Sequence, residues 1–168
     1  MTTTTPPTSQ RPPSAPAPLA PVIAVVFLGS LGTGAVTNGV FFVTSQKYDF
    51  TPIANLALGF SLGAVYILGA LAIGPFSRAL AARHASISTR NVAAAVMLLL
   101  GLLCAVPLLI ARPWAMWLFT LAYIPFTGAV WPIAESYISG GRRGPELRRA
   151  IGVFNLAWAS AVAASFWG

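Results

Sequence analysis

The chain has 168 residues, of which 57% are hydrophobic and only 8% are charged, whereas about 25% of the residues of a typical soluble domain are charged. This composition indicates a membrane protein. The net charge of +7 predicts no nucleic-acid partner, because the basic residues fall between apolar runs rather than along one face. One Cys, one His and three acidic residues are too few for a usual metal site or a pair of catalytic carboxylates, so we expect no metal, no cofactor and no enzymatic activity.

The amino-terminal stretch, residues 1–19, is rich in Pro and Thr and carries one charge. Such a composition buries too little apolar surface to offset the chain entropy lost on folding. It also lacks the charged start and short apolar core of a secretory signal. We therefore expect a disordered tail on the cytosolic side.

Five apolar runs follow, and each is close to the roughly 20 residues that a helix needs to cross about 30 Å of hydrocarbon. Segments of this length must be helical, because lipid offers no partners to unpaired backbone groups. The predicted spans cover residues 20–44, 52–75, 91–111, 114–138 and 149–168. The predicted fold class is thus an all-α membrane protein, with residues 20–168 forming one transmembrane helical bundle.

Basic residues are distributed unevenly between the two sides of these spans. Eight of the ten lie in the tail and in the second and fourth connections: Arg11, Arg78, Arg83, Arg90, Arg142, Arg143, Arg148 and Arg149. Lys47 and Arg112 lie on the other side. By the positive-inside rule, we expect a multi-pass protein of the cell (inner) membrane whose amino terminus is cytosolic.

Polar and aromatic side chains gather on one face of four of the spans when residues are placed about 100° apart. Inside a membrane such side chains normally face protein or a cavity. The candidates for lining a substrate path are Thr33, Thr37, Asn38, Asn55, Tyr66, Tyr123, Thr127, Trp131, Asn155 and Trp158. The alternative for each is ordinary helix packing. The third span has no such stripe and is expected to face lipid at the periphery.

Glycines in the first two spans suggest places where helices approach closely. Gly32 and Gly39 share the far side of the first span, and Gly59 and Gly63 have the small-xxx-small spacing in the second. We expect helix contacts at these positions.

The order of these features resembles the amino-terminal bundle of the major facilitator superfamily of transporters. The shared features are the cytosolic tail, a Gly-rich second span leading into a short basic connection, and a tight turn between spans three and four. The strongest local match is the junction of spans four and five, where a Pro and an acid end one helix and a basic pair followed by Gly, Asn and Trp opens the next. Here these residues are Pro132, Glu135, Arg148, Arg149, Gly152, Asn155 and Trp158.

The second connection lies where this family keeps its signature motif, G-x-L-A-D-R-x-G-R-R. Gly74 and Arg83 match this motif, but Arg78 stands where it has Asp and Ala79 where it has Arg. The resemblance implies a cytosolic gate here, in which the Asp latches the two halves of the transporter. With Arg78 in its place, that latch cannot form.

Glu135 is a candidate to replace the missing acid, because it is the only acidic residue inside a predicted span. A lone carboxylate at that depth is costly unless it is paired. The arginines at the same level are Arg78, Arg83, Arg148 and Arg149, and we expect one or more of them to pair with Glu135. The alternative is that Glu135 simply reaches the interface.

The resemblance implies transport of a small solute by a secondary transporter. Family members have about twelve helices in two halves, so the chain is expected to be a fragment that lacks the C-terminal half of the transporter as a partner. The alternative is a small non-transporting multi-pass membrane protein that acts as a binding or assembly partner. An intramembrane enzyme is not supported, because Glu135 alone supplies no nucleophile with a base.

Overall fold

The computed structural model describes residues 16–84 and 86–167, and within them it contains six α-helices and no strand. The helices are α1 (Leu19–Lys47), α2 (Pro52–Arg83), α3 (Thr89–Leu103), α4 (Val106–Leu109), α5 (Pro113–Ser139) and α6 (Gly144–Ser165). The all-α fold class is confirmed. Most of the predicted disordered tail, up to residue 15, lies outside the described residues.

Four stretches of helix are long and apolar enough to cross a membrane, judged by length and composition: α1, α2, α3 together with α4, and α5. These stretches identify a membrane protein. Helix α6 falls outside this set, because Glu146, Arg148 and Arg149 occupy its first two turns. The fifth predicted span therefore stays a prediction.

Helix α2 continues well past the predicted end at residue 75. It begins at the side chain of Thr51, whose Oγ1 accepts a hydrogen bond from the backbone N–H of Ala54 at 3.2 Å, and it ends at Arg83. Ala, Leu and Arg dominate its last two turns and have high helix propensity, so the helix extends beyond the apolar run. The expectation of a basic loop from residue 76 is wrong, and the connection to α3 occupies residues 84–88.

The third predicted span is broken rather than continuous. Helix α3 ends at Leu103 and the single turn α4 begins at Val106. Pro107 explains the break, because its ring clashes with the carbonyl four residues earlier, which is that of Leu103. At the break, the N–H of Ala105 bonds the carbonyl of Leu102 at 3.1 Å, a tighter turn than in an α-helix.

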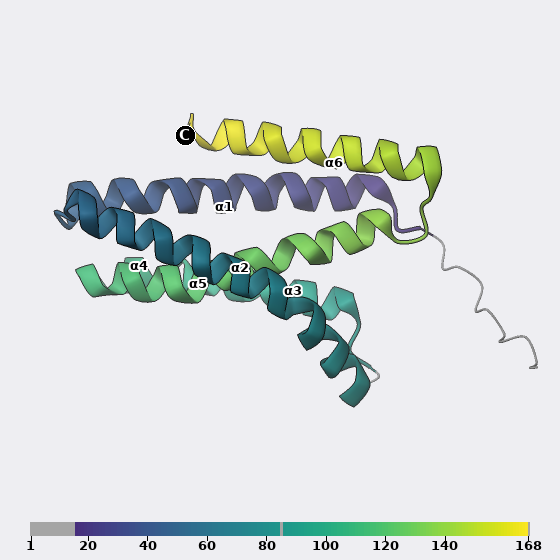
Figure 1. Ribbon diagram of the computed structural model, residues 1–168, viewed down its shortest axis with the longest axis horizontal. Coiled ribbons are helices and arrows are strands. Elements are labelled where there is room, and N and C mark those ends of the chain that lie inside the picture. The colour runs from purple at the N-terminus through teal and green to yellow at the C-terminus, as the bar shows by residue number, and fades with distance from the viewer. Residues whose placement is uncertain (1–15, 85, 168) are drawn as a thin grey trace, which may run out of the picture.

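Helix α5 is the centre of the bundle. It contacts each of the remaining helices. In its most apolar stretch 56% of the residues are buried, compared with 11–17% in the other three spans. The most extensive contacts join α2 to α5 and α1 to α6 (Figure 1). Helix α3 packs mainly on α5, so it lies at the periphery of the bundle, as the absence of a polar stripe predicted.

The close helix approaches use other glycines than those expected. A Cβ on Gly69 of α2 would overlap the carbonyl of Pro125 of α5, and a Cβ on Gly128 of α5 would overlap the carbonyl of Tyr66. By contrast, a Cβ on Gly32, Gly39 or Gly63 would meet nothing within 4 Å, and on Gly59 it would make an ordinary contact with the ring of Phe41. The expected helix contacts are therefore wrong for Gly32, Gly39 and Gly63, whereas Gly59 does lie at a contact between α2 and α1.

Candidate functional site

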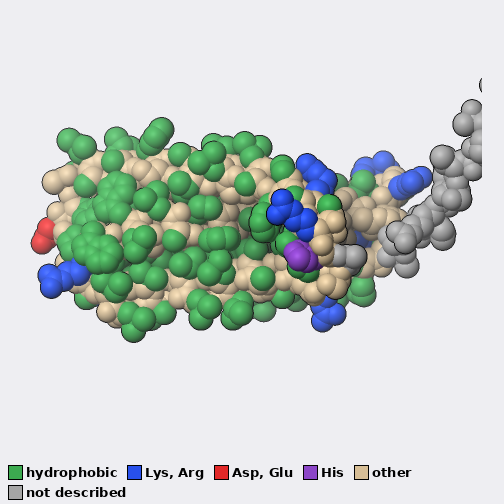
Figure 2. Space-filling view, turned by 90° about the horizontal axis from the view of Figure 1, so that it is seen from below, with side chains coloured by type: hydrophobic (Ala, Val, Ile, Leu, Met, Phe, Trp, Pro, Cys, Tyr) green, Lys and Arg blue, Asp and Glu red, His purple; other side chains and the backbone are tan. Residues whose placement is uncertain are grey.

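The basic connections all lie at one end of the bundle. The segment before α1, the α2–α3 connection and the α5–α6 connection all lie toward that end (Figure 1), and Figure 2 shows Lys and Arg side chains gathered toward that end with an apolar surface beyond them. Lys47 ends α1 and Arg112 precedes α5 at the opposite end. The described basic residues therefore lie toward the two ends of the bundle and not along its apolar middle, as expected for helices that cross a membrane.

Arg142 is buried in the α5–α6 connection, with only 7% of its surface exposed. Its guanidinium donates hydrogen bonds to the carbonyls of Tyr137 at 3.1 Å and Ile138 at 2.9 Å, and also to the carbonyl of Ala17. Gly141, with φ of 75°, supplies the left-handed backbone that this tight connection needs. Arg142 thus ties the last turn of α5 to the segment that leads into α1.

The expected ion pair of Glu135 is not formed in this structure. Glu135 is exposed, and it makes no ion pair with any residue in the described part of the chain. The pair that does form joins Arg142 to the exposed Glu146 at 3.5 Å. The remaining gate candidates lie in the last turns of α2 and the first turns of α6: Gly74, Arg78, Arg83, Arg148 and Arg149.

The polar candidates on α1 are used largely within the protein. Thr33 donates to the carbonyl of Gly29 and Thr37 to that of Thr33, each at 2.8 Å. Asn38 donates to the hydroxyl of Ser165 on α6 at 3.4 Å. These contacts agree with the packing alternative for the two threonines and assign Asn38 to the α1–α6 interface.

Asn55 joins the first two helices near their connection. Its Oδ1 accepts from the hydroxyl of Thr44 at 2.6 Å, and its Nδ2 donates to the hydroxyl of Ser45 at 2.7 Å. Because both ends of the amide already have partners on α1, Asn55 has a structural role here.

The candidates at the centre of the bundle are packed in its core. Tyr123 and Thr127 of α5 are both buried, and the ring of Tyr123 lies 5.0 Å from that of Phe119. Tyr66 is half-buried and packs against this core from α2. In this conformation these three residues pack against other side chains of the core.

Asn155 and Trp158 of α6 are both exposed. They lie less than one turn apart, and Asn155 lies about 120–140° around the helix from Ala150 and Ala161, the buried residues of α6. Among the predicted path residues, they are the ones that present their side chains outward.

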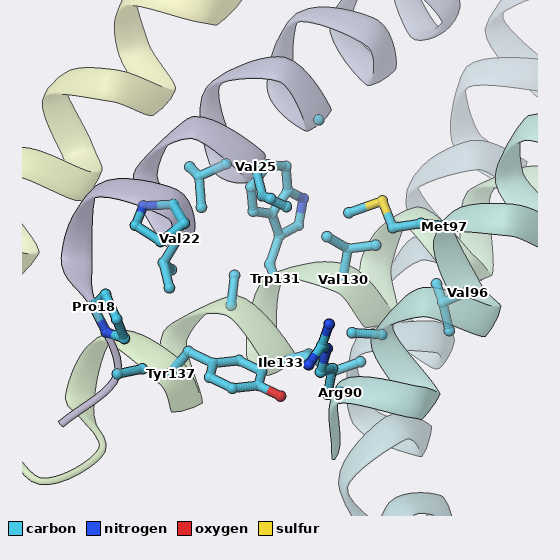
Figure 3. Close-up of a pocket in the computed structure, with 16 residues that line it drawn as sticks. Pro18, Val22, Val25, Arg90, Val96, Met97, Val130, Trp131, Ile133 and Tyr137 are labelled. Carbon is cyan, nitrogen blue, oxygen red and sulfur yellow. The ribbon is translucent and has the colours of Figure 1, made fainter. Parts of the chain in front are cut away.

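A cavity of about 450 Å³ lies between α1, α3 and α5. Its lining comes from residues 17–29, 90–97 and 130–137 and is almost entirely aliphatic or aromatic (Figure 3). Trp131 is the only predicted path residue that lines it, and its ring also meets the ring of Phe154 of α6 edge-on at 6.5 Å. The cavity is thus distinct from the predicted polar path.

Arg90 and Tyr137 are polar residues of the cavity that do not belong to the predicted polar stripes. Both line the cavity, with Arg90 in the first turn of α3 and Tyr137 in the last turn of α5. Neither lies on a polar stripe, because each lies at the polar end of a helix whose middle is apolar. Arg142 was missed as a contact residue too, although a basic residue just past a helix end commonly bonds the last carbonyls.

Comparisons with known proteins leave the family unassigned. No protein family, no curated protein and no solved structure matches the chain. The helices therefore define the class, a multi-helix membrane protein, and its function is argued from the geometry.

Proposed function

We propose that the chain is part of a secondary transporter for a small solute in the cell (inner) membrane, related to the major facilitator superfamily and with its amino terminus in the cytosol. Helices α1, α2, α5 and α6 form one side of the solute path. In this proposal, a second half of the transporter is the partner that forms the other side. This proposal takes α6 as a fifth crossing of the membrane.

The observation that carries the proposal is the exposed amide of Asn155. It lies about 9 Å along the helix axis from Arg149, well inside the predicted fifth span. A polar group without partners is costly in hydrocarbon, so an exposed amide at this depth favours a face that meets water or protein rather than lipid. Trp158, one turn further, adds an aromatic surface to that face.

The order of helix pairing gives independent support. If α3 and α4 count as one span, the two main contacts join span two to span four and span one to span five. Exchanging two repeats of three spans puts span two in the place of span five and span four in the place of span one, and so converts the first pair into the second. Repeats of three helices in opposite orientations are a feature of the major facilitator halves.

A labelling experiment tests the exposed face. In a Cys104→Ser background, Asn155→Cys and Leu156→Cys place thiols at two exposed neighbours about 100° apart on α6. We expect a membrane-impermeant maleimide to label Asn155→Cys in intact membranes, and to label Leu156→Cys at least about tenfold more slowly. Solutes from a panel of sugars, amino acids and organic cations that slow labelling of Asn155→Cys become the candidates for uptake assays in proteoliposomes.

Equal protection of both cysteines from the maleimide would place this face in lipid. That result would contradict the path and favour the alternative, a membrane protein that assembles with partners without transporting a solute.

A further inference from the structure

We propose that the cavity between α1, α3 and α5 binds one acyl chain of an anionic phospholipid, with the phosphate of the headgroup on Arg90 and Tyr137. This inference goes beyond the proposed transport function. It depends only on the helices lying in a membrane.

The walls of the cavity fit a hydrocarbon chain. Val22, Val26, Val96 and Val130 line it together with Met97, so a bound molecule meets almost only aliphatic surface. A volume of about 450 Å³ lies in the range of ligand sites, about 300–1,000 Å³. An acyl chain in this space would add dispersion contacts with the apolar side chains that line it.

The depth of the cavity fits one leaflet. From Pro18 to Gly29 on α1 and from Arg90 to Met97 on α3, the lining extends inward over about 10–16 Å at the helical rise. Half of the hydrocarbon core is about 15 Å thick. Met97 closes the inner end, because its Cε lies 3.7 Å from the place a Cβ would take on Gly29.

The opening of the cavity faces the lipid side of the bundle. Helices α1 and α3 both pack on α5 and contact one another little. Val25 lines the cavity and is still 54% exposed, so the gap between α1 and α3 is open to the apolar surface. A lipid can therefore enter sideways from the bilayer, a route that a water-soluble ligand does not have.

Charge selects an anionic headgroup. Arg90 is exposed, and within the described residues it neither pairs with an acid nor donates a hydrogen bond from its side chain. Arg90 in the first turn of α3 and Tyr137 in the last turn of α5 both line the cavity (Figure 3), where these helix ends lie toward the basic end of the bundle. Basic pockets between transmembrane helices on the cytosolic side commonly bind anionic headgroups.

The test uses the whole chain purified in detergent, with lipid retention measured by native mass spectrometry. The probes are phosphatidylglycerol, phosphatidylcholine with the same acyl chains, and inorganic phosphate. We expect phosphatidylglycerol to be retained in preference to phosphatidylcholine and inorganic phosphate not to bind. Arg90→Gln should weaken phosphatidylglycerol binding about fivefold, which corresponds to about 1 kcal/mol for one basic residue near anionic lipid.

Two further variants locate the lipid. Arg143→Gln removes an exposed arginine at the same end but outside the cavity and should leave retention unchanged. Ala93→Phe fills the cavity and should abolish preferential retention of phosphatidylglycerol. If Ala93→Phe does not fold, Val25→Trp can be used to block the opening of the cavity. It should likewise abolish preferential retention of phosphatidylglycerol.

The proposal is overturned if both lipids are retained equally, if Arg90→Gln binds like Arg143→Gln, or if the filled cavity still retains phosphatidylglycerol. It is also overturned if lipid-free protein is a dimer that Ala93→Phe dissociates, because the occupant is then a second copy. The labelling of Asn155→Cys is measured separately, so failure of one proposal is distinguishable from failure of the other.

Discussion

At the scale of single residues, Arg142 shows how a charge is accommodated inside this membrane protein. The guanidinium has five N–H donors and no acceptor, so it can bond several carbonyls at once. Here it bonds the carbonyls of Tyr137, Ile138 and Ala17, two of which belong to the last turn of α5. Its ion pair with the exposed Glu146 contributes little by comparison, because water screens it.

Replacing Arg142 by Ala should lower the free energy of unfolding by about 2 kcal/mol, because hydrogen bonds from a charged group are lost and buried carbonyls lose their partner. Arg143→Ala, at the exposed neighbour, should change it by less than about 0.5 kcal/mol. Denaturant unfolding in detergent micelles, followed by tryptophan fluorescence, measures both. Equal effects of the two variants would show that the bonds of Arg142 do not stabilise the connection.

At the scale of helices, the crossing of α2 and α5 depends on two glycines that face the partner backbone. Gly69 lies against the carbonyl of Pro125, and Gly128 lies against that of Tyr66. In a membrane, helices associate through such close packing rather than through the hydrophobic effect, so small residues at the crossing determine the approach. Gly63, two turns earlier on α2, lies beside open space and has no such role.

Gly69→Ala should therefore destabilise the bundle by about 1–3 kcal/mol through overpacking. Gly63→Ala is the matched control on the same helix, and it should be neutral or stabilise by up to about 1 kcal/mol, because Ala has the higher helix propensity. Thermal unfolding in detergent compares the two variants. If both changed stability with the same sign, the close approach of α2 and α5 would be contradicted.

At the scale of the whole molecule, the basic connections gather at one end of a bundle whose middle is apolar (Figure 2). The last turns of α2, the first turn of α3 and the connection to α6 all contribute arginines to that end. The positive-inside rule predicts that this end faces the cytosol.

Single cysteines in the Cys104→Ser background test this topology. Ser86→Cys marks the α2–α3 connection and Asp49→Cys marks the α1–α2 connection, and both positions are exposed. An impermeant maleimide added to intact cells should label Asp49→Cys. It should label Ser86→Cys only after the membrane is permeabilised. Labelling of both from outside would contradict the predicted orientation.

Phe166→Cys in the same background decides whether α6 crosses the membrane. Phe166 is exposed and directly follows α6. Labelling of this cysteine from outside, like that of Asp49→Cys, would establish the fifth span. Labelling only after the membrane is opened would show that α6 does not cross.

The local properties of this protein could be predicted from its sequence alone. The helical class, the approximate positions of the apolar helices and the separation of charges follow from hydropathy and composition, which depend on neighbouring residues only. The break before α4 was not predicted, although the effect of Pro107 on the carbonyl four residues earlier is local. The end of α2 at Arg83 was missed because hydropathy reports the edge of the membrane and not the end of the helix.

What only the tertiary structure decided is which residues meet. Positions 63 and 69 of α2 are both glycines, but only Gly69 faces the backbone of α5. Which glycine does so depends on how two helices that are distant in the sequence cross. Likewise, Arg90 and Tyr137 stand at the edges of two apolar helices 47 positions apart in the sequence, and packing around α5 brings them to one end of a cavity. Such placements arise from the fit of whole helix surfaces, which no single stretch of sequence contains.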